Sequence, residues 1–186
     1  FINKLKELGN VLTPILEENV KELFEDTEIA SHRPIQKNFK RRKVFVPSID
    51  HTWGLDLAFL PKVSKTNDNY KAFLLIVDIF SRYAWVRPVK DTKSETISKE
   101  IRDVIKKSGR KPQYAWTDRG SEMLKHTTKL FSELKITHYF SNNETKVPHV
   151  ERFVRTLKNR INAYLENNHT ERFIDNLQEI VEGYNN

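Results

Sequence analysis

The chain has 186 residues, of which 38% are apolar and 31% are charged, and its formal net charge is +7. This composition suits one ordinary folded domain with an extension and excludes wholesale disorder. The longest apolar run, about residues 72–79, is too short to cross a membrane, and no signal peptide is visible at the start. The absence of cysteine excludes disulfides and Cys-ligated zinc, and the scattered histidines give no reason to expect zinc.

The first fifty residues predict a helical segment and then a basic linker. Residues 1–31 are acidic and contain a predicted helix over 10–25, which Thr13 can cap and Pro14 can begin. Residues 32–50 show little periodicity and predict an extended linker. This linker contains the run Lys40-Arg41-Arg42-Lys43, which is typical either of a solvated linker or of phosphate contact or nuclear import.

Residues 51–186 predict the main domain, an α/β fold with a five-stranded mixed sheet flanked by helices. Three strands come first and, because their links are short, they should form an antiparallel meander. Helices and strands then alternate, with Thr92 or Ser94 as the cap of the first helix and Gly109 as its stop. The predicted strands are 52–60, 71–79, 83–89, 113–117 and 136–140, and the predicted helices are 93–107, 121–134, 148–167 and 170–183.

Three acids stand in positions that favour a shared metal site. Asp56 lies inside an apolar strand, on the face opposite to its large apolar side chains; Asp118 ends a strand; and Glu151 opens the helix at 148–167. Converging carboxylates can hold two Mg²⁺ or Mn²⁺ ions for an in-line phosphoryl displacement, which needs no protein nucleophile. The alternative is structural: an edge-strand acid, a turn cap and a partner of a helix dipole.

The helix at 148–167 also carries a polar face that suits DNA. Glu151, Arg155, Lys158 and Asn162 share one side of it, beside the apolar stripe. A row of cations beside a metal-binding acid would hold a DNA backbone against the metals. The simpler interpretation is a surface ion pair between Glu151 and Arg155.

Other polar and aromatic residues receive structural interpretations. We expect Asp78 to cap a turn, Glu122 to begin a helix and His149 to face solvent. The three tryptophans are expected in the core rather than as base-stacking platforms; they are Trp53, Trp85 and Trp116.

Four stretches of this sequence resemble the catalytic core of retroviral-type integrases, in the RNase H-like group of DDE recombinases. They are Trp53-Gly-Leu-Asp-Leu57, the stretch 70–86, Thr117-Asp-Arg-Gly-Ser-Glu122, and the stretch 143–158 with its Asn-Glu-Thr-Lys and Val-Glu-Arg-Phe segments. The likeness covers roughly residues 40–186 and is strongest to integrases of Maverick/Polinton DNA transposons. The resemblance implies an RNase H-like fold.

The resemblance also implies roles for particular residues. Asp56, Asp118 and Glu151 would bind two Mg²⁺ or Mn²⁺ ions, and residues 141–147 would form a mobile active-site loop. Trimming of the element's 3′ ends and strand transfer into target DNA would follow, carried out by dimers or tetramers in the host nucleus. The expected DNA contacts are Lys158, Arg155, Arg152, Lys146, Lys40, Arg41, Arg42 and Lys43.

Some features depart from the family's pattern. The interval from Asp118 to Glu151 is slightly short, Pro148 and His149 replace small residues, and no zinc module or C-terminal DNA-binding domain is seen. We therefore expect a fragment of a longer protein. Three rival functions stay open: a domesticated, non-catalytic DNA-binding or assembly module, an RNase H-like hybrid or junction nuclease, and a structural protein that binds nucleic acid through its basic face.

Overall fold

A computed structural model describes residues 44–59, 64–141 and 148–186 of the chain. Its centre is a five-stranded sheet in the order β3-β2-β1-β4-β5. β1 and β2 pair antiparallel, as do β2 and β3, whereas β4 lies parallel to both β1 and β5. The predicted mixed sheet with three antiparallel strands first is confirmed. The strands are β1 (Thr52–Phe59), β2 (Ala72–Asp78), β3 (Ala84–Val89), β4 (Tyr114–Thr117) and β5 (Thr137–Phe140).

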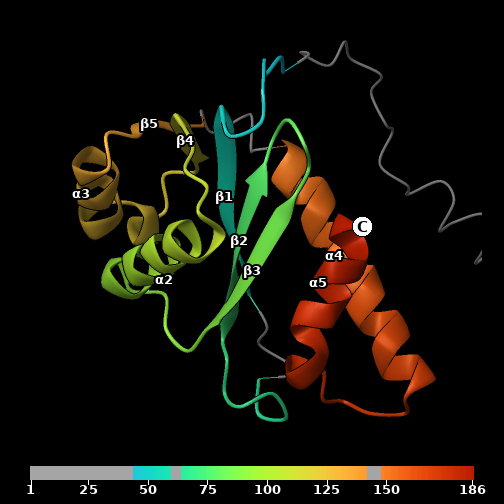
Figure 1. The fold of residues 1–186 in the computed structure, drawn as a ribbon. Coiled ribbons are helices and arrows are strands. Elements are labelled where there is room, and N and C mark those ends of the chain that lie inside the picture. The colour runs from blue at the N-terminus through green and yellow to red at the C-terminus, as the bar shows by residue number, and fades with distance from the viewer. Residues whose placement is uncertain (1–43, 60–63, 142–147) are drawn as a thin grey trace, which may run out of the picture. The chain divides into compact units, whose positions relative to one another are not determined.

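Helices cover both faces of this sheet (Figure 1). On one side lie α2 (Ser94–Ser108) and α3 (Lys125–Glu133), and on the other lie α4 (Pro148–Asn167) and α5 (Leu177–Asn185). Within the described residues, no helix is long and apolar enough to cross a membrane. The predicted helix at 148–167 is confirmed at both ends.

The alternation of side chains along β1 produces two separate apolar cores. Trp53, Leu55 and Leu57 pack with α2 and α3, whereas Ala58 packs with α4 and α5. Every residue of β2 is buried, because helices cover it on both faces and strands flank it on both edges. Each fully buried Leu, Ile or Phe contributes roughly 1.5–3 kcal/mol by leaving water.

The beginning of α2 corrects the expected cap. Lys93 is the N-cap residue and makes no side-chain cap bond, so neither Thr92 nor Ser94 caps this helix. Ser94 instead donates its hydroxyl to the carbonyl of Leu124 and accepts from the backbone N–H of His126, at 3.1 Å in both cases. It therefore ties α2 to the start of α3. Gly109 ends α2 as predicted, with φ at 67°.

Two predicted helices begin later than the sequence suggested. The segment predicted at 121–134 is a short 3₁₀ turn, η1 (Ser121–Met123), followed by α3 after a break at Leu124. The segment predicted at 170–183 becomes helical only at η2 (Ile174–Asn176), and α5 then follows.

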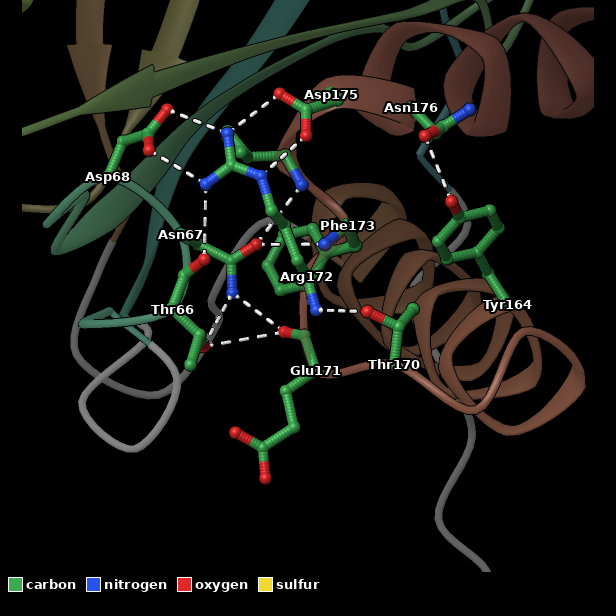
Figure 2. A network of polar contacts seen from close by, with 11 residues as sticks. Thr66, Asn67, Asp68, Tyr164, Thr170, Glu171, Arg172, Phe173, Asp175 and Asn176 are labelled. Atoms are coloured by element: carbon green, nitrogen blue, oxygen red, sulfur yellow. Dashed lines mark hydrogen bonds and ion pairs between the residues drawn. The ribbon is translucent and has the colours of Figure 1, made fainter.

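The late start of the last helix has a visible cause (Figure 2). The side-chain oxygen of the fully buried Asn67 accepts the backbone N–H groups of Phe173 and Ile174, at 2.9 and 3.0 Å. Arg172 pairs with Asp68 and Asp175. Because these backbone donors are already bonded to a loop about a hundred residues earlier, the segment does not enter the helix sooner.

Candidate active site

The register of β1 and β4 points two of the three candidate acids toward neighbouring positions. Trp53 pairs with Ala115, and Gly54 pairs with Trp116. Continued for two more residues, beyond the end of β4, the same register would bring Asp118 level with Asp56. Neighbouring strands lie about 4.8 Å apart, and residues in parallel register point to the same face. β1 is a central strand, so the interpretation of Asp56 as an edge-strand acid is wrong.

Both of these acids lie on the face of the sheet that α4 covers. Asp56 is paired with Leu75, which belongs to the apolar core under α4 and α5. Trp116 packs against that same core, and Asp118 is two residues farther along the chain. The expected placement of Asp56 opposite the large apolar side chains of its strand is confirmed.

The carboxylates of Asp56 and Asp118 are half-buried and each accepts a nearby backbone N–H. The Asp56 Oδ1 accepts from the N–H of Leu57 at 2.8 Å, and the Asp118 Oδ1 accepts from the N–H of Gly120 at 3.1 Å. The bond from Gly120 is the one hydrogen bond of the Asp118 carboxylate in the described part of the chain. A carboxylate has about four acceptor positions, so Asp118 keeps most of its capacity for a ligand.

A chain of hydroxyls and one imidazole holds the backbone at Asp118. The buried Thr117 hydroxyl donates to the carbonyl of Asp118 at 2.8 Å, and its oxygen lies 2.9 Å from Nε2 of His138. The other ring nitrogen of His138 lies 3.3 Å from the Thr128 hydroxyl. Burial lowers the pKa of His138 to about 4, so the neutral ring donates from Nε2 and accepts at Nδ1.

Sequence reasoning missed the roles of Thr117 and His138. The only local signal was the threonine directly before Asp118, because the position of His138 depends on the pairing of β4 with β5.

Glu151 stands in the first turn of α4, which Val150, Phe153 and Leu157 anchor in the core. Its side chain is exposed, and among the described residues it makes no hydrogen bond and no ion pair. The alternative surface pair with Arg155 is therefore not formed. No group of three acids or histidines within the described ranges is close enough to hold a metal ion. Asp56, Asp118 and Glu151 therefore do not form such a group in the described structure, and Glu151 follows directly after residues 142–147.

The cationic side of α4 partly faces the sheet. Lys158 and Asn162 line a small cavity of about 100 Å³ together with Ala58, which is two residues from Asp56 on the same face. Arg152 and Arg155 are exposed, and neither forms an ion pair with a described residue. The remaining expected DNA contacts, Lys146 and Lys40 to Lys43, lie outside the described residues, as does the predicted helix at 10–25.

Two further predictions can be judged. Asp78 caps its turn as expected, accepting from the N–H groups of Phe80 and Ser81, and it also binds Arg110 at 3.1 Å. The expectation that His149 faces solvent is wrong: its ring is half-buried, and burial lowers its pKa. Its position in the first turn of α4, where Val150 is drawn into the core, explains the burial.

The side chains of the site suit hard divalent cations. Asp56 and Asp118 offer only oxygen donors, and no cysteine or imidazole of the described chain joins them to form a group that would favour zinc. Because these two carboxylates are partly shielded from water, they attract a cation more strongly than they would in bulk solvent. They are still open enough for water to reach them.

The strand order, the flanking helices and the acids on one sheet face define an RNase H-like integrase core. The chain belongs to the integrase core domain family, whose model matches residues 49–145, just over half of the chain. That range includes Asp56 and Asp118 and ends before Glu151.

One curated relative and several solved structures are similar to this chain. An uncharacterised transposon-derived protein of Caenorhabditis elegans is 31% identical over 128 residues, which are 68% of this chain and 45% of that protein. The chain therefore spans less than half the length of this relative. Among solved structures, the HTLV-2 integrase catalytic core domain in complex with magnesium matches with a TM-score of 0.58 and 22% identity, over 72% of this chain and 84% of that one.

Two more solved structures share the fold. The simian T-cell lymphotropic virus intasome matches with a TM-score of 0.64 and 22% identity, covering 80% of this chain and 53% of that one. The catalytic core of BIV integrase matches with a TM-score of 0.57 and 19% identity, covering 71% and 81%. At these identities the likeness shows the fold alone.

Proposed function

We propose that this chain is the catalytic core of a DNA integrase from a mobile element, of the Maverick/Polinton type, that joins the element's 3′ ends to target DNA. The observation that carries the proposal is the parallel register of β1 and β4, which, continued for two residues, would set Asp56 beside Asp118. Membership of the integrase core domain family and the sequence likeness to a transposon-derived protein support it.

In this proposal Asp56, Asp118 and Glu151 hold two Mg²⁺ or Mn²⁺ ions. When bound, such ions favour an ionised attacking oxygen and stabilise a departing oxyanion. Asp56 and Asp118 fix one side of the scissile phosphate from the sheet, and Glu151 completes the site from the first turn of α4. The Thr117–His138 chain keeps the backbone at Asp118 in place while the phosphate is bound.

In the joining step one phosphodiester bond is exchanged for another, so the number of these bonds does not change. Water first cleaves a P–O bond near the element's 3′ end and leaves a free 3′-hydroxyl. That hydroxyl then attacks a target phosphorus, a new P–O bond forms, and the target's own 3′ oxygen departs and takes up a proton. Lys158, Arg155 and Arg152 neutralise backbone phosphates along α4.

The proposal extends to the arrangement of the chain. Residues 51–186 would form the core, preceded by a helical segment at 1–31 and a basic linker at 32–50 that contacts DNA through Lys40 to Lys43. The protein would act on DNA as a dimer or tetramer, since two element ends must reach one target, and it would work in the host nucleus.

A non-catalytic DNA-binding module is the second candidate, because the three acids do not form a metal-binding group in the described residues. Under this function the cations of α4 would bind DNA, and metal ions would not matter.

The test is a joining assay with Mg²⁺ or Mn²⁺ on the whole 186-residue chain and on Asp118→Asn, with Asp103→Asn on α2 as a matched surface control. One substrate is a linear duplex that carries the element's end. A second is a branched duplex that mimics the joined product, on which the reverse transesterification needs no end sequence. Products that disappear only in Asp118→Asn support the integrase. Salt-sensitive DNA binding without any metal-dependent product would favour the binding module.

A further inference from the structure

Four aromatic rings form a continuous strip across β4 and β5, which we call the aromatic strip: His51, Tyr114, Trp116 and Tyr139. The ring centroids of His51 and Tyr114 are 4.8 Å apart, and those of Tyr114 and Tyr139 are 6.3 Å apart. Trp116 and Tyr139 are stacked, with centroids 5.6 Å apart and planes at 29°. Because Trp116 pairs with Tyr139 in register, the two rings share one face of the sheet.

Most of this strip lies beyond the part of the sheet face that α4 and α5 cover, and only Trp116 packs against the edge of their core. Those helices pack against β1, β2 and β3, while α3 packs on β5 from the opposite face. Tyr139 is 37% exposed, and Phe45 beside the strip is 87% exposed. An open cavity of about 370 Å³ is lined by Val44, Phe45, Val46, His51, Thr52, Tyr114, Thr137 and Tyr139. Tyr139 and Phe45 are therefore the exposed rings of this surface, and His51, Tyr114 and Trp116 are partly buried beside them.

The surroundings of the strip favour nucleic acid as the occupant. At one end, Trp116 is two residues before Asp118 on the same face. Aromatic rings beside a phosphate-binding site are a combination that binds unpaired bases.

We propose that the aromatic strip stacks an unpaired nucleotide at the end of the DNA whose phosphate lies at Asp56 and Asp118. A base inside a duplex is stacked on both faces, so protein rings can receive only a base that has left the duplex. The inference rests on the proposed function, because it assigns the bound end to the same site.

The experiment compares binding of a duplex with a three-nucleotide single-stranded tail and of the same duplex with blunt ends, by fluorescence anisotropy without turnover. All variants carry Asp118→Asn, so that the DNA stays intact. Tyr139→Ala should lose roughly tenfold in affinity for the tailed duplex and keep its affinity for the blunt one, since stacking of one base is removed. Tyr139→Phe should restore the preference, and Phe80→Ala, which removes another exposed ring in the β2–β3 turn, should leave it unchanged.

Three results would overturn the inference. The first is an equal affinity of the unaltered chain for both duplexes. The second is a loss in Tyr139→Ala that is the same for tailed and blunt DNA. The third is a shift of Tyr139→Ala from dimer to monomer in sedimentation, which would assign the strip to a second copy. The joining assay is independent of this binding preference, so a failure of the proposed function is distinguishable from a failure of the strip.

Discussion

Asp78 and Asp118 stand at the ends of the two strands that flank β1, and their surroundings are opposite. Asp78 is 0% exposed, and its oxygens are filled by its own turn and by Arg110. Arg110 is held in turn by Asp50 at 2.8 Å and lies over the rings of Tyr83 and Trp85. Asp118 is half-buried and accepts one backbone N–H in the described structure.

The difference separates a structural acid from one that is free to take the role proposed for Asp118. A buried carboxylate whose lone pairs are all taken stabilises the fold and has nothing left for a ligand. A carboxylate that keeps its lone pairs on a partly open face can bind a cation, at the risk of being unsatisfied without one. Stability and activity should therefore respond in opposite ways to changes at the two kinds of site.

The largest effect is expected at Glu151, where activity and stability should separate completely. Glu151→Gln should reduce DNA joining by at least about 100-fold, since it removes a charge needed only for the reaction. Its free energy of unfolding should change by less than about 0.5 kcal/mol, because the side chain is exposed and makes no ion pair or hydrogen bond among the described residues. The measurements are the joining assay and urea unfolding.

Glu166→Gln is the matched control for this change, because Glu166 is also exposed and lies on the same helix. It should leave both quantities unaltered. Equal activity losses in the two variants would mean that general charge on α4, rather than a metal-binding acid, is responsible.

Asp78→Asn should show the reverse pattern. Removing one charge from a buried pair leaves Arg110 without a full partner, so we expect a loss of about 3 kcal/mol in the free energy of unfolding. Asp103→Asn is the control, since Asp103 pairs with Arg87 and Lys107 near the surface and should cost less than about 1 kcal/mol. The measurement is the midpoint of urea unfolding. It is compared between variants whose free energy of unfolding has the same dependence on urea concentration. Similar midpoints for the two variants would contradict a structural role for Asp78.

Thr117→Val tests whether the hydroxyl chain positions Asp118. The buried hydroxyl links the Asp118 carbonyl to His138, so its loss should lower the free energy of unfolding by about 1–2 kcal/mol. Joining should fall as well, because the backbone at Asp118 loses its support, and Thr117→Ser should restore both by returning the hydroxyl. A Val variant that is less stable but fully active at a temperature where it is folded would reduce Thr117 to a packing residue.

Local patterns in the sequence predicted most of the fold and the sheet face of Asp56, and non-local contacts account for what they missed. Alternation along β1 was enough to place Asp56 on the face opposite Trp53, and the turn after Asp78 was enough to make that acid a cap. No local pattern pairs Asp78 with Arg110 or Ser94 with Leu124, because those contacts join segments about thirty residues apart. The prediction that all three tryptophans lie in the core holds only in part. Trp53 is in the core as expected, whereas Trp85 and Trp116 are only partly buried.

The smallest expected effect concerns the protonation of His138. Burial lowers its pKa to about 4, whereas the unfolded chain has the ordinary value near 6.5. As the pH falls from 6.5 to 4, the unfolded state takes up a proton that the folded state refuses, so the free energy of unfolding decreases across this window. Below pH 4 both states carry the proton and the decrease stops. Because the ring keeps some contact with solvent, we expect a total of about 1–2 kcal/mol.

The matched variant is His138→Gln, whose amide can still donate to Thr117 and does not titrate. Carboxylates also titrate in the lower part of this window, so the informative quantity is the difference between the two proteins, measured by urea unfolding at pH 7, 6, 5 and 4.5. The unaltered chain should lose more stability than the variant as the pH falls. Parallel pH profiles would mean that His138 is protonated as easily in the folded state as in the unfolded one, and that the Thr117–His138 chain does not depend on a neutral ring. A different result would be a steeper loss of stability in the unaltered chain, together with a loss of DNA joining in the same pH window. It would show that the Thr117–His138 chain supports Asp118, the acid that the fold leaves able to bind a ligand, in contrast to the fully bonded Asp78.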